Sequence, residues 1–475
     1  MRNYLQFYIN GEWVEPGVAR VADVINPATE AVSGQISLGS SADVDRAVAA
    51  AKDAFESWSQ TSVPERLEIL KRIQEEYNRR AADLGAAVTE EMGAPAELGN
   101  GFHAMLGGGH LQTAIEVLEN FQFEELRGQT LVVKEPIGVC GLITPWNWPL
   151  NQVAVKVFPA LAAGCTIVLK PPQLAPYSAQ ILAEIIAASG LPAGVFNMVQ
   201  GRGSEIGTVM SEHPDIDMIS FTGSEPVGVE IARNAATTVK RVCQELGGKS
   251  AYVVLDDGLL ATNVANATAS MMTNSGQTCS AGSRLLVPQA RLADAIAAAK
   301  VAAESVTVGD PNSGVAMGPV VSKSQYNIVQ EYIQSGIDDG AELVAGGVGR
   351  PEGLETGYYV KPTVFVTDNS TRIAREEIFG PVLCIIPYRD LDDAVSIAND
   401  TSFGLAGYVD GEDLSVCQAV ARRMRTGAVY INGGFDFHAA FGGYKRSGNG
   451  REWGEAGFEE YLEIKSLLGY ESAQG

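Results

Sequence analysis

The stretch TIVLKPPQLAPYSAQILAEIIAASGLPAGVFNMV, residues 166–199, decides which fold class the sequence predicts. It opens with a short apolar run, TIVLK, continues with a helical pattern over SAQILAEIIAAS that Gly190 ends, and closes with a second apolar run. Short buried strands that alternate with helices are typical of a parallel sheet covered on both faces. The stretch therefore predicts a doubly wound α/β domain.

The same alternation extends in both directions along the chain. GVCGLI and a segment through Lys156 precede the stretch, and MISF, a helix from about Glu225 and RVCQEL follow it. Beyond residue 250 the pattern returns in YVVL, RLLV, the helical LADAIAAAKVAAESV, VLCIIPY, DDAVSIAND and GAVYIN. We therefore expect two successive α/β units, and we expect them to pack closely because no low-complexity linker separates them.

Several segments fall outside this alternation of strands and helices. Asn10-Gly11 between β-rich runs predicts a hairpin, and two amphipathic helices are expected after Ser41 and from Pro64. Residues 118–135 interrupt the first unit with strand-like, charged sequence, and the tail YLEIKSLLGY is strand-like without an evident partner nearby. Because unpaired strands invite association, we predict pairing between subunits, which a monomeric mass in solution would contradict.

The composition indicates a globular protein and argues against nucleic-acid and membrane partners. The 475 residues are 46% hydrophobic and 19% charged, which is typical of a globular protein with a large core. The net charge of −23 argues against a nucleic-acid or anionic-lipid partner, since phosphate binding needs a positive surface. No signal peptide and no run of about 18 apolar residues is present, so no membrane association is predicted.

The cysteines and histidines predict neither a disulfide framework nor a metal site. Six cysteines are scattered without a CxxC pair, and the four histidines form no HExxH pattern, although His103 and His110 fall on one helical face. We expect a cytoplasmic protein without a bound metal.

Cys279, in NSGQTCSAGSR, is the candidate nucleophile. It follows a helix-forming segment and lies in a Gly/Ser-rich turn, where a backbone approaches a ligand closely. Its thiolate would attack an aldehyde carbon to give a thiohemiacetal, whose oxyanion favours loss of hydride. A buried structural cysteine is the alternative, and the other five cysteines, in apolar segments, fit that alternative better.

Two further residues complete the expected chemistry. Glu245 in QELGGKS ends a predicted strand before a Gly-Gly turn, where a general base is placed to activate the water that hydrolyses a thioester. Asn147 in TPWNWPL has an amide that, with the Cys279 backbone N–H, would hold a tetrahedral oxyanion. Taken alone, the first is more typical of a solvated charge in a loop and the second of a turn residue.

The cofactor signals are individually weaker. GRGSEIG spaces its glycines, among them Gly203 and Gly207, one residue too long for the dinucleotide fingerprint. MISFTGSEPVGVEIA is better, because a strand runs into Gly223-Ser224 and then a helix, whose N-terminus suits a pyrophosphate. Lys170, at the end of TIVLK, is a donor for ribose or phosphate.

Taken together, TPWNWPL, FTGSEPVG, ELGGKS, GQTCSAGSR and EEIFGPV resemble the aldehyde dehydrogenase superfamily in order and approximate spacing. The resemblance runs from NGEWV to FGGYKRSGNGRE, over nearly the whole chain. It implies Cys279 as nucleophile, Glu245 as general base and Asn147 as oxyanion donor. The residues that it implies for NAD binding are Thr144, Pro145, Trp146, Lys170, Gln173, Gly203, Gly207, Phe221, Thr222, Gly223, Ser224, Gly228, Leu246, Glu377 and Phe379.

The resemblance also implies a domain organisation. Residues 1–117 and 136–247 would form an atypical Rossmann, dinucleotide-binding domain, residues 248–448 a catalytic domain, and residues 118–135 and 449–475 a small β oligomerisation flap. Members of the family are usually homodimers or homotetramers. Lys156 and Glu455 are further candidates, for a proton path or a structural role.

The chain departs from the family pattern after Lys170. Gln173 stands where a glutamate is common, and that glutamate would bind both ribose hydroxyls and repel a 2′-phosphate. We therefore expect NAD as cofactor, with NADP tolerated more than is usual.

The substrate channel is expected to mix amide, hydroxyl and aromatic groups, and to carry no arginine that clamps a substrate carboxylate. Such a channel suits a medium-sized aldehyde, aromatic or terpenoid. Its candidate residues are Asn151, Gln152, Thr278, Ser280, Phe435, Phe437 and His438.

Two other functions stay open at this point. In a CoA-acylating semialdehyde dehydrogenase, CoA would attack the thioester and no water-activating carboxylate would be needed, whereas Glu245 is present. A non-catalytic structural, binding or redox-sensing relative would be expected to lose Cys279 or Glu245, and both are intact.

Overall fold

The computed structural model describes residues 1–470 and contains two seven-stranded sheets. The first has the order β12-β11-β8-β9-β10-β2-β3, and its central strands are parallel. The apolar runs of the sequence became these strands almost residue for residue, while β2 and β3 add an antiparallel edge. The strands are β2 (Phe7–Ile9), β3 (Glu12–Val14), β8 (Val139–Ile143), β9 (Thr166–Lys170), β10 (Phe196–Met198), β11 (Met218–Thr222) and β12 (Arg241–Glu245).

Helices bury both faces of this sheet, which explains why its strands are apolar without alternation. Leu142 of β8 packs into the core of one face and Val139 and Ile143 into the core of the other. Around the sheet lie α1 (Ser41–Trp58), α2 (Val63–Met92), α4 (Ala104–Asn120), α5 (Pro149–Ala163), α6 (Tyr177–Ala188), α7 (Thr208–Glu212) and α8 (Glu225–Ala235).

The hairpin expected at Asn10-Gly11 is confirmed. Its two turn residues have φ of 54° and 79°, the left-handed values that such a tight turn requires. The helices expected after Ser41 and from Pro64 also form, and Ser40 and Ser62 cap their N-termini.

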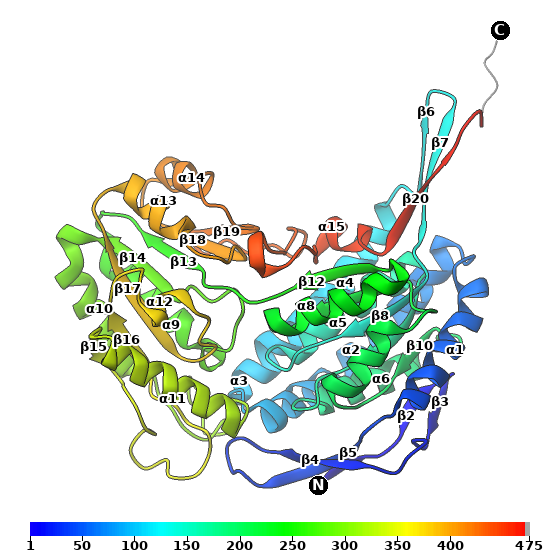
Figure 1. Ribbon diagram of the computed structural model, residues 1–475, viewed down its shortest axis with the longest axis horizontal. Helices are drawn as coiled ribbons and strands as arrows, with labels where there is room; N and C mark the ends of the chain where they lie inside the picture. Colours follow the sequence, from blue (N-terminus) through cyan, green and yellow to red (C-terminus); the bar gives the residue numbers. More distant parts are fainter. Residues whose placement is uncertain (471–475) are drawn as a thin grey trace.

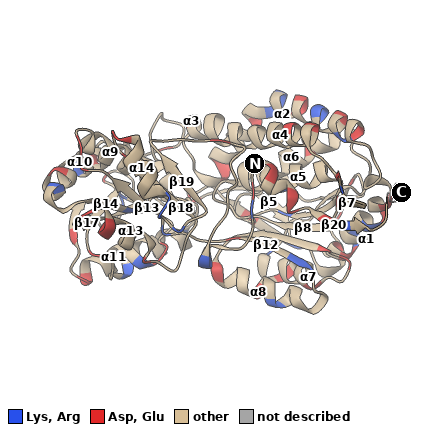
Figure 2. Ribbon diagram, turned by 90° about the horizontal axis from the view of Figure 1, so that it is seen from above, with Lys and Arg blue, Asp and Glu red and all other residues tan. Residues whose placement is uncertain are grey.

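The second sheet has the order β15-β16-β17-β14-β13-β18-β19 and is parallel except for the edge strand β15. Viewed from above, its strands and helices occupy the opposite half of the molecule from α2, α4 and α6 (Figure 2). Its strands are β13 (Ala251–Val254), β14 (Arg284–Pro288), β15 (Glu342–Ala345), β16 (Thr363–Val366), β17 (Val382–Tyr388), β18 (Ala406–Asp410) and β19 (Ala428–Ile431). Its helices are α9 (Leu260–Met272), α10 (Leu292–Ser305), α11 (Lys323–Asp338), α12 (Arg372–Arg375), α13 (Leu391–Asn399) and α14 (Leu414–Ala421).

Two smaller sheets complete the fold. β6 (Glu124–Arg127), β7 (Thr130–Pro136) and β20 (Leu462–Leu467) form an antiparallel sheet that projects from the molecule (Figure 1). The C-terminal strand β20 therefore has a partner within the chain, β7. The two strands are far apart in the sequence, so the pairing was not evident from it. β1 (Arg2–Tyr4), β4 (Val21–Ile25) and β5 (Val32–Ser37) form the other sheet, and the short helix α15 (Gly454–Glu459) precedes β20.

Candidate functional site

Cys279 lies in a loop that leads from α9 to β14, between the two large sheets. The loop begins with a tight turn in which Asn274 and Ser275 have φ of 55° and 57°. At Gly276 a Cβ atom would lie only 2.1 Å from the carbonyl oxygen of Gly380, so this position must be glycine. The turn therefore fixes the chain direction just before the nucleophile.

The loop after β8 holds the Cys279 loop from the other side. The Asn147 side-chain amide donates to the carbonyl oxygen of Gln277 at 3.2 Å, and the Trp148 indole donates to the Thr278 hydroxyl at 2.9 Å. Asn274 returns a hydrogen bond to the carbonyl oxygen of Asn147 at 2.8 Å. Because one Asn147 amide hydrogen suffices for Gln277, the second is free to face a substrate oxygen.

Glu245 is the last residue of β12, as the sequence predicts, and only 2% of it is exposed. Neither of its carboxylate oxygens has a hydrogen-bond partner. Burial and, secondly, the nearby Glu452 carboxylate raise the pKa of Glu245 well above its usual value. This environment favours the protonated form of Glu245, and the group acts as a base once its proton has been removed.

The Cys279 thiol also has a raised pKa. Burial is the main cause, and the carboxylates of Glu377 and Glu245 add to it because they disfavour a second negative charge. The thiolate therefore forms only when a nearby base takes the proton or a positive charge is brought close.

A cavity of about 730 Å³ opens on one side of Cys279. Of the expected channel residues, Asn151, Gln152, Thr278, Ser280 and Phe435 line it. Phe437 and His438 do not line it. The Phe437 ring packs against His110, with ring centroids 5.3 Å apart, and His438 bonds to Glu116 at 2.9 Å, so these two residues fasten the loop to α4.

Most of the remaining lining was missed by sequence reasoning, because it comes from strands and loops far apart in the chain. Aromatic rings alternate in it with amide and hydroxyl side chains. The missed residues include Phe102, Trp148, Tyr252, Tyr408, Asp410, Tyr430, Phe441, Glu452 and Trp453.

A second cavity, of about 260 Å³, opens on the other side of Cys279. Eight of the residues expected to bind the cofactor line it: Pro145, Trp146, Thr222, Gly223, Ser224, Leu246, Glu377 and Phe379. Gln325 and Gly247 line it as well and were missed. Among the described residues, only Thr222 and Cys279 line both cavities, so the sulfur lies where the two meet.

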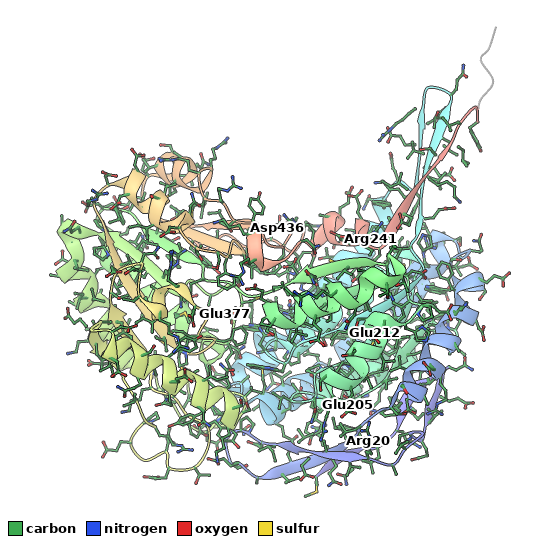
Figure 3. The ribbon with its side chains drawn as sticks, viewed as in Figure 1. Arg20, Glu205, Glu212, Arg241, Glu377 and Asp436 are labelled. Atoms are coloured by element: carbon green, nitrogen blue, oxygen red, sulfur yellow. The ribbon has the colours of Figure 1, made fainter. Side chains whose placement is uncertain are left out.

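The walls of the second cavity are well ordered by internal contacts. Glu377 accepts a hydrogen bond from the Gly248 amide at 3.0 Å, and burial raises its pKa to about 7. Phe379 has a left-handed φ of 57°, and its ring meets the edge of Trp146 at 5.4 Å. Figure 3 shows Glu377 between the two halves of the molecule. Ser224 forms the N-terminal cap residue of α8, where free amides suit an anionic group.

Comparison with known proteins agrees with this geometry. The model of the aldehyde dehydrogenase family matches residues 13–467. This chain belongs to the aldehyde dehydrogenase family. A 3-succinoylsemialdehyde-pyridine dehydrogenase from Pseudomonas sp. is 52% identical over 477 residues, covering 100% of each chain.

Solved structures of the family agree with the fold throughout. Aldehyde dehydrogenase C of Pseudomonas syringae, crystallised as a Cys-to-Ala mutant with NAD+ and octanal, is 49% identical, with a TM-score of 0.98 over 99% of this chain and 97% of that one. A Mycobacterium tuberculosis aldehyde dehydrogenase with NAD+ is 41% identical, with a TM-score of 0.96 over 98% of each chain.

The other residues that the family resemblance singles out for the cofactor lie outside the second cavity. Lys170 ends β9, its ammonium donates to the Pro171 carbonyl at 3.0 Å, and burial lowers its pKa to about 8. Gly203 and Gly207 bound a short π-helical turn. The full set outside the cavity is Thr144, Lys170, Gln173, Gly203, Gly207, Phe221 and Gly228.

Lys156 pairs with Glu452, a residue that the sequence analysis did not single out. Glu455 is exposed, whereas Glu452 is buried, forms an ion pair with Lys156 and lines the large cavity. Lys156 also donates to the Ser220 hydroxyl at 3.0 Å. Trp453, the residue that follows Glu452, has a left-handed φ of 67°.

Residues 1–470 contain neither a membrane-spanning helix nor a cluster of metal ligands. No helix there is both long and apolar enough to cross a bilayer. No group of three or more His, Cys, Asp or Glu side chains is arranged there to hold a metal ion.

Proposed function

We propose that this protein oxidises an aldehyde to its carboxylic acid with a nicotinamide dinucleotide as hydride acceptor. The observation that carries the proposal is the position of Cys279, at the junction of a roomy aromatic cavity and a smaller one with a helix N-terminus and Glu377 in its wall. A nucleophile there reaches an aldehyde from one side while a dinucleotide lies on the other.

Cys279, Asn147 and Glu245 each have one role in the proposed reaction. The Cys279 thiol loses its proton to solvent, and the thiolate attacks the carbonyl carbon. The resulting oxyanion is held by the free Asn147 amide hydrogen and the Cys279 backbone N–H. A bound nicotinamide accepts the hydride that leaves. The thioester that remains on Cys279 is attacked by water, whose proton goes to the ionised Glu245 carboxylate, and the carboxylic acid departs.

For the cofactor, we assign the pyrophosphate to Trp146 and Ser224 at the N-terminus of α8, and the nicotinamide ribose and ring to Glu377 and Phe379. Lys170 and Gln173 would hold the adenosine ribose, with Thr144, Gly203, Gly207, Phe221 and Gly228 shaping the surrounding backbone. The NAD+ complexes of the related structures support this use of the fold. Gln173 leaves NAD as the cofactor and NADP as a tolerated substitute.

The substrate would be a medium-sized aldehyde with an aromatic or other bulky apolar body, because about 730 Å³ of aromatic-lined space lies beside Cys279. The related protein from Pseudomonas sp. is named for a pyridine semialdehyde and the one from Pseudomonas syringae binds octanal, so both carry sizeable aldehydes.

We further propose that residues 1–117 and 136–247 bind the dinucleotide, that residues 248–448 are catalytic, and that residues 118–135 and 449–475 join subunits into a homodimer or homotetramer. Residues 471–475 of the last segment lie outside the described part. The projecting sheet of β6, β7 and β20 supports an assembly role, because strands that leave the body of a protein are available for pairing. Free cysteines favour the reducing cytoplasm.

Absorbance of reduced nicotinamide on a panel of aldehydes, with NAD or NADP and with or without CoA, tests the proposal. We expect acid formation that does not require CoA. Strict dependence on CoA would favour the CoA-acylating alternative, and no turnover of any aldehyde would favour the non-catalytic one.

A further inference from the structure

The charged side chains that line the large cavity are all acidic in the described part of the chain. Within residues 1–470, no Lys, Arg or His side chain lines it, whereas Glu245, Asp410 and Glu452 do. Glu245 has a raised pKa, and Glu452 is ion-paired with Lys156. In the same part of the chain Asp410 has no ion pair, although it is only 7% exposed. Its negative charge is therefore directed at the cavity without a protein cation to balance it.

Three tyrosines connect this carboxylate with the nucleophile loop. Tyr252, Tyr408 and Tyr430 occupy the same register on the adjacent strands β13, β18 and β19. Their rings stack, with centroids 5.0 and 4.9 Å apart and planes inclined by 9° and 15°. All three line the cavity, and because their faces are turned to one another we call the set the tyrosine stack.

Hydrogen bonds hold two rings of the tyrosine stack, the central Tyr408 and Tyr252 at one end. The Tyr408 hydroxyl donates to the carbonyl oxygen of Ser280, the residue after Cys279, at 2.9 Å. The Tyr252 hydroxyl donates to one carboxylate oxygen of Asp410 at 2.5 Å. An aldehyde on Cys279 therefore lies beside stacked rings that lead toward an acidic group.

A carboxylate attracts cations and repels anions, and it does so most strongly where water is excluded. A substrate carboxylate would have no positive partner here and would carry the cost of a buried, unpaired charge. We propose that Asp410, held in place by Tyr252 of the tyrosine stack, is a specificity determinant that selects aldehydes bearing a positive charge, such as a quaternary or protonated ammonium group, away from the carbonyl. This inference rests on the proposed function.

Three benzaldehydes with different para substituents test it. Trimethylammonium and tert-butyl groups have nearly the same shape and differ in charge, and a carboxylate supplies the opposite charge. We compare kcat/KM for wild type and Asp410→Asn, because the ratio between the two proteins cancels the intrinsic reactivity of each aldehyde. Asp256→Asn is the matched control, since Asp256 is an exposed acid that pairs with Arg291 and does not line the cavity.

We expect Asp410→Asn to lower the ammonium-to-tert-butyl preference by about tenfold, the equivalent of about 1.4 kcal/mol, and to raise the relative use of the carboxylate aldehyde. Asp256→Asn should leave both preferences unchanged. The inference is overturned if the preferences are the same in wild type and Asp410→Asn, or if wild type uses the carboxylate aldehyde as well as the tert-butyl one.

A second measurement needs no variant. Phenyltrimethylammonium should compete with tert-butylbenzaldehyde on wild type, whereas benzoate at the same concentration should not. Equal inhibition by the two ions would overturn the inference even if Asp410→Asn failed to fold. Failure of wild type to oxidise any of the aldehydes would instead reject the proposed function, so the two failures are distinguishable.

Discussion

Replacing Glu245 by glutamine separates the two halves of the proposed reaction. The two side chains have nearly the same shape, and neither carboxylate oxygen of Glu245 has a hydrogen-bond partner that the change would remove. The cavity lining therefore stays intact while the only atom able to accept a proton from water at this position is lost. We expect hydride transfer to proceed and thioester hydrolysis to stop.

The size of the effect follows from the role. A general base contributes about 10²–10⁴-fold, which corresponds to roughly 3–5 kcal/mol of the barrier to hydrolysis. Steady-state kcat of Glu245→Gln should fall by that factor. The burst of reduced nicotinamide after mixing enzyme, dinucleotide and aldehyde should keep an amplitude close to one per active site, even if its rate falls.

Stopped-flow absorbance measures burst and steady state in one experiment, and added hydroxylamine, which attacks thioesters directly, should restore turnover of the variant. Loss of the burst amplitude together with kcat would place Glu245 before hydride transfer and refute the reasoning. An unchanged kcat would refute it equally.

The raised pKa of Glu245 also fixes the sign of two pH effects. Because only the ionised carboxylate accepts a proton, wild-type kcat should increase as pH rises through this pKa, and Glu245→Gln should lose that dependence. An acid whose pKa is higher in the folded state binds more protons there, so its ionisation destabilises the fold as pH rises from about 4.5 upward. Thermal unfolding should accordingly show Glu245→Gln to be the more stable protein at neutral pH.

Three further predictions concern the other site residues. Cys279→Ala should abolish oxidation while dinucleotide affinity, measured by calorimetry, survives; normal turnover would reject the mechanism. Asn147→Ala should lower kcat by about 10²–10³-fold, since one oxyanion donor is lost. Its folding should suffer little, because Asn274 still donates to Gln277 at 3.4 Å, and an equally large loss of unfolding free energy would point to a structural role instead. Gln173→Glu should raise the ratio of NAD to NADP efficiency by repelling the 2′-phosphate, and a fall in that ratio would contradict the cofactor assignment.

Much of the fold could be predicted because buried strands are short, apolar and bounded by turns. TIVLK and VLCIIPY coincide with β9 and β17, and Gly190 ends α6 with a left-handed φ of 77°. Cys279, Glu245 and Asn147 were candidates from local sequence, and the order of the five motifs that resemble the family gave them their expected roles. Pairing over long distances was not predictable in this way, as β20 with β7 shows.

The lining of the substrate cavity could not be predicted from local sequence patterns either. Tyr252, Tyr408 and Tyr430 are ordinary β-strand residues in the sequence, and only the strand order of the second sheet stacks them. Phe435 and Phe437 are two residues apart, yet one faces the cavity and the other packs on α4, because the path of their loop decides which ring turns inward. Loop paths depend on tertiary packing, which local patterns do not encode.

The sharing of Cys279 and Thr222 by two otherwise separate cavities has a consequence for the evolution of this enzyme. A substitution in the lining of the large cavity need not alter the second cavity. Substitutions in the large cavity alone can therefore change which aldehydes the enzyme accepts. Related enzymes can therefore differ in the aldehyde that they oxidise while they keep the same dinucleotide as hydride acceptor.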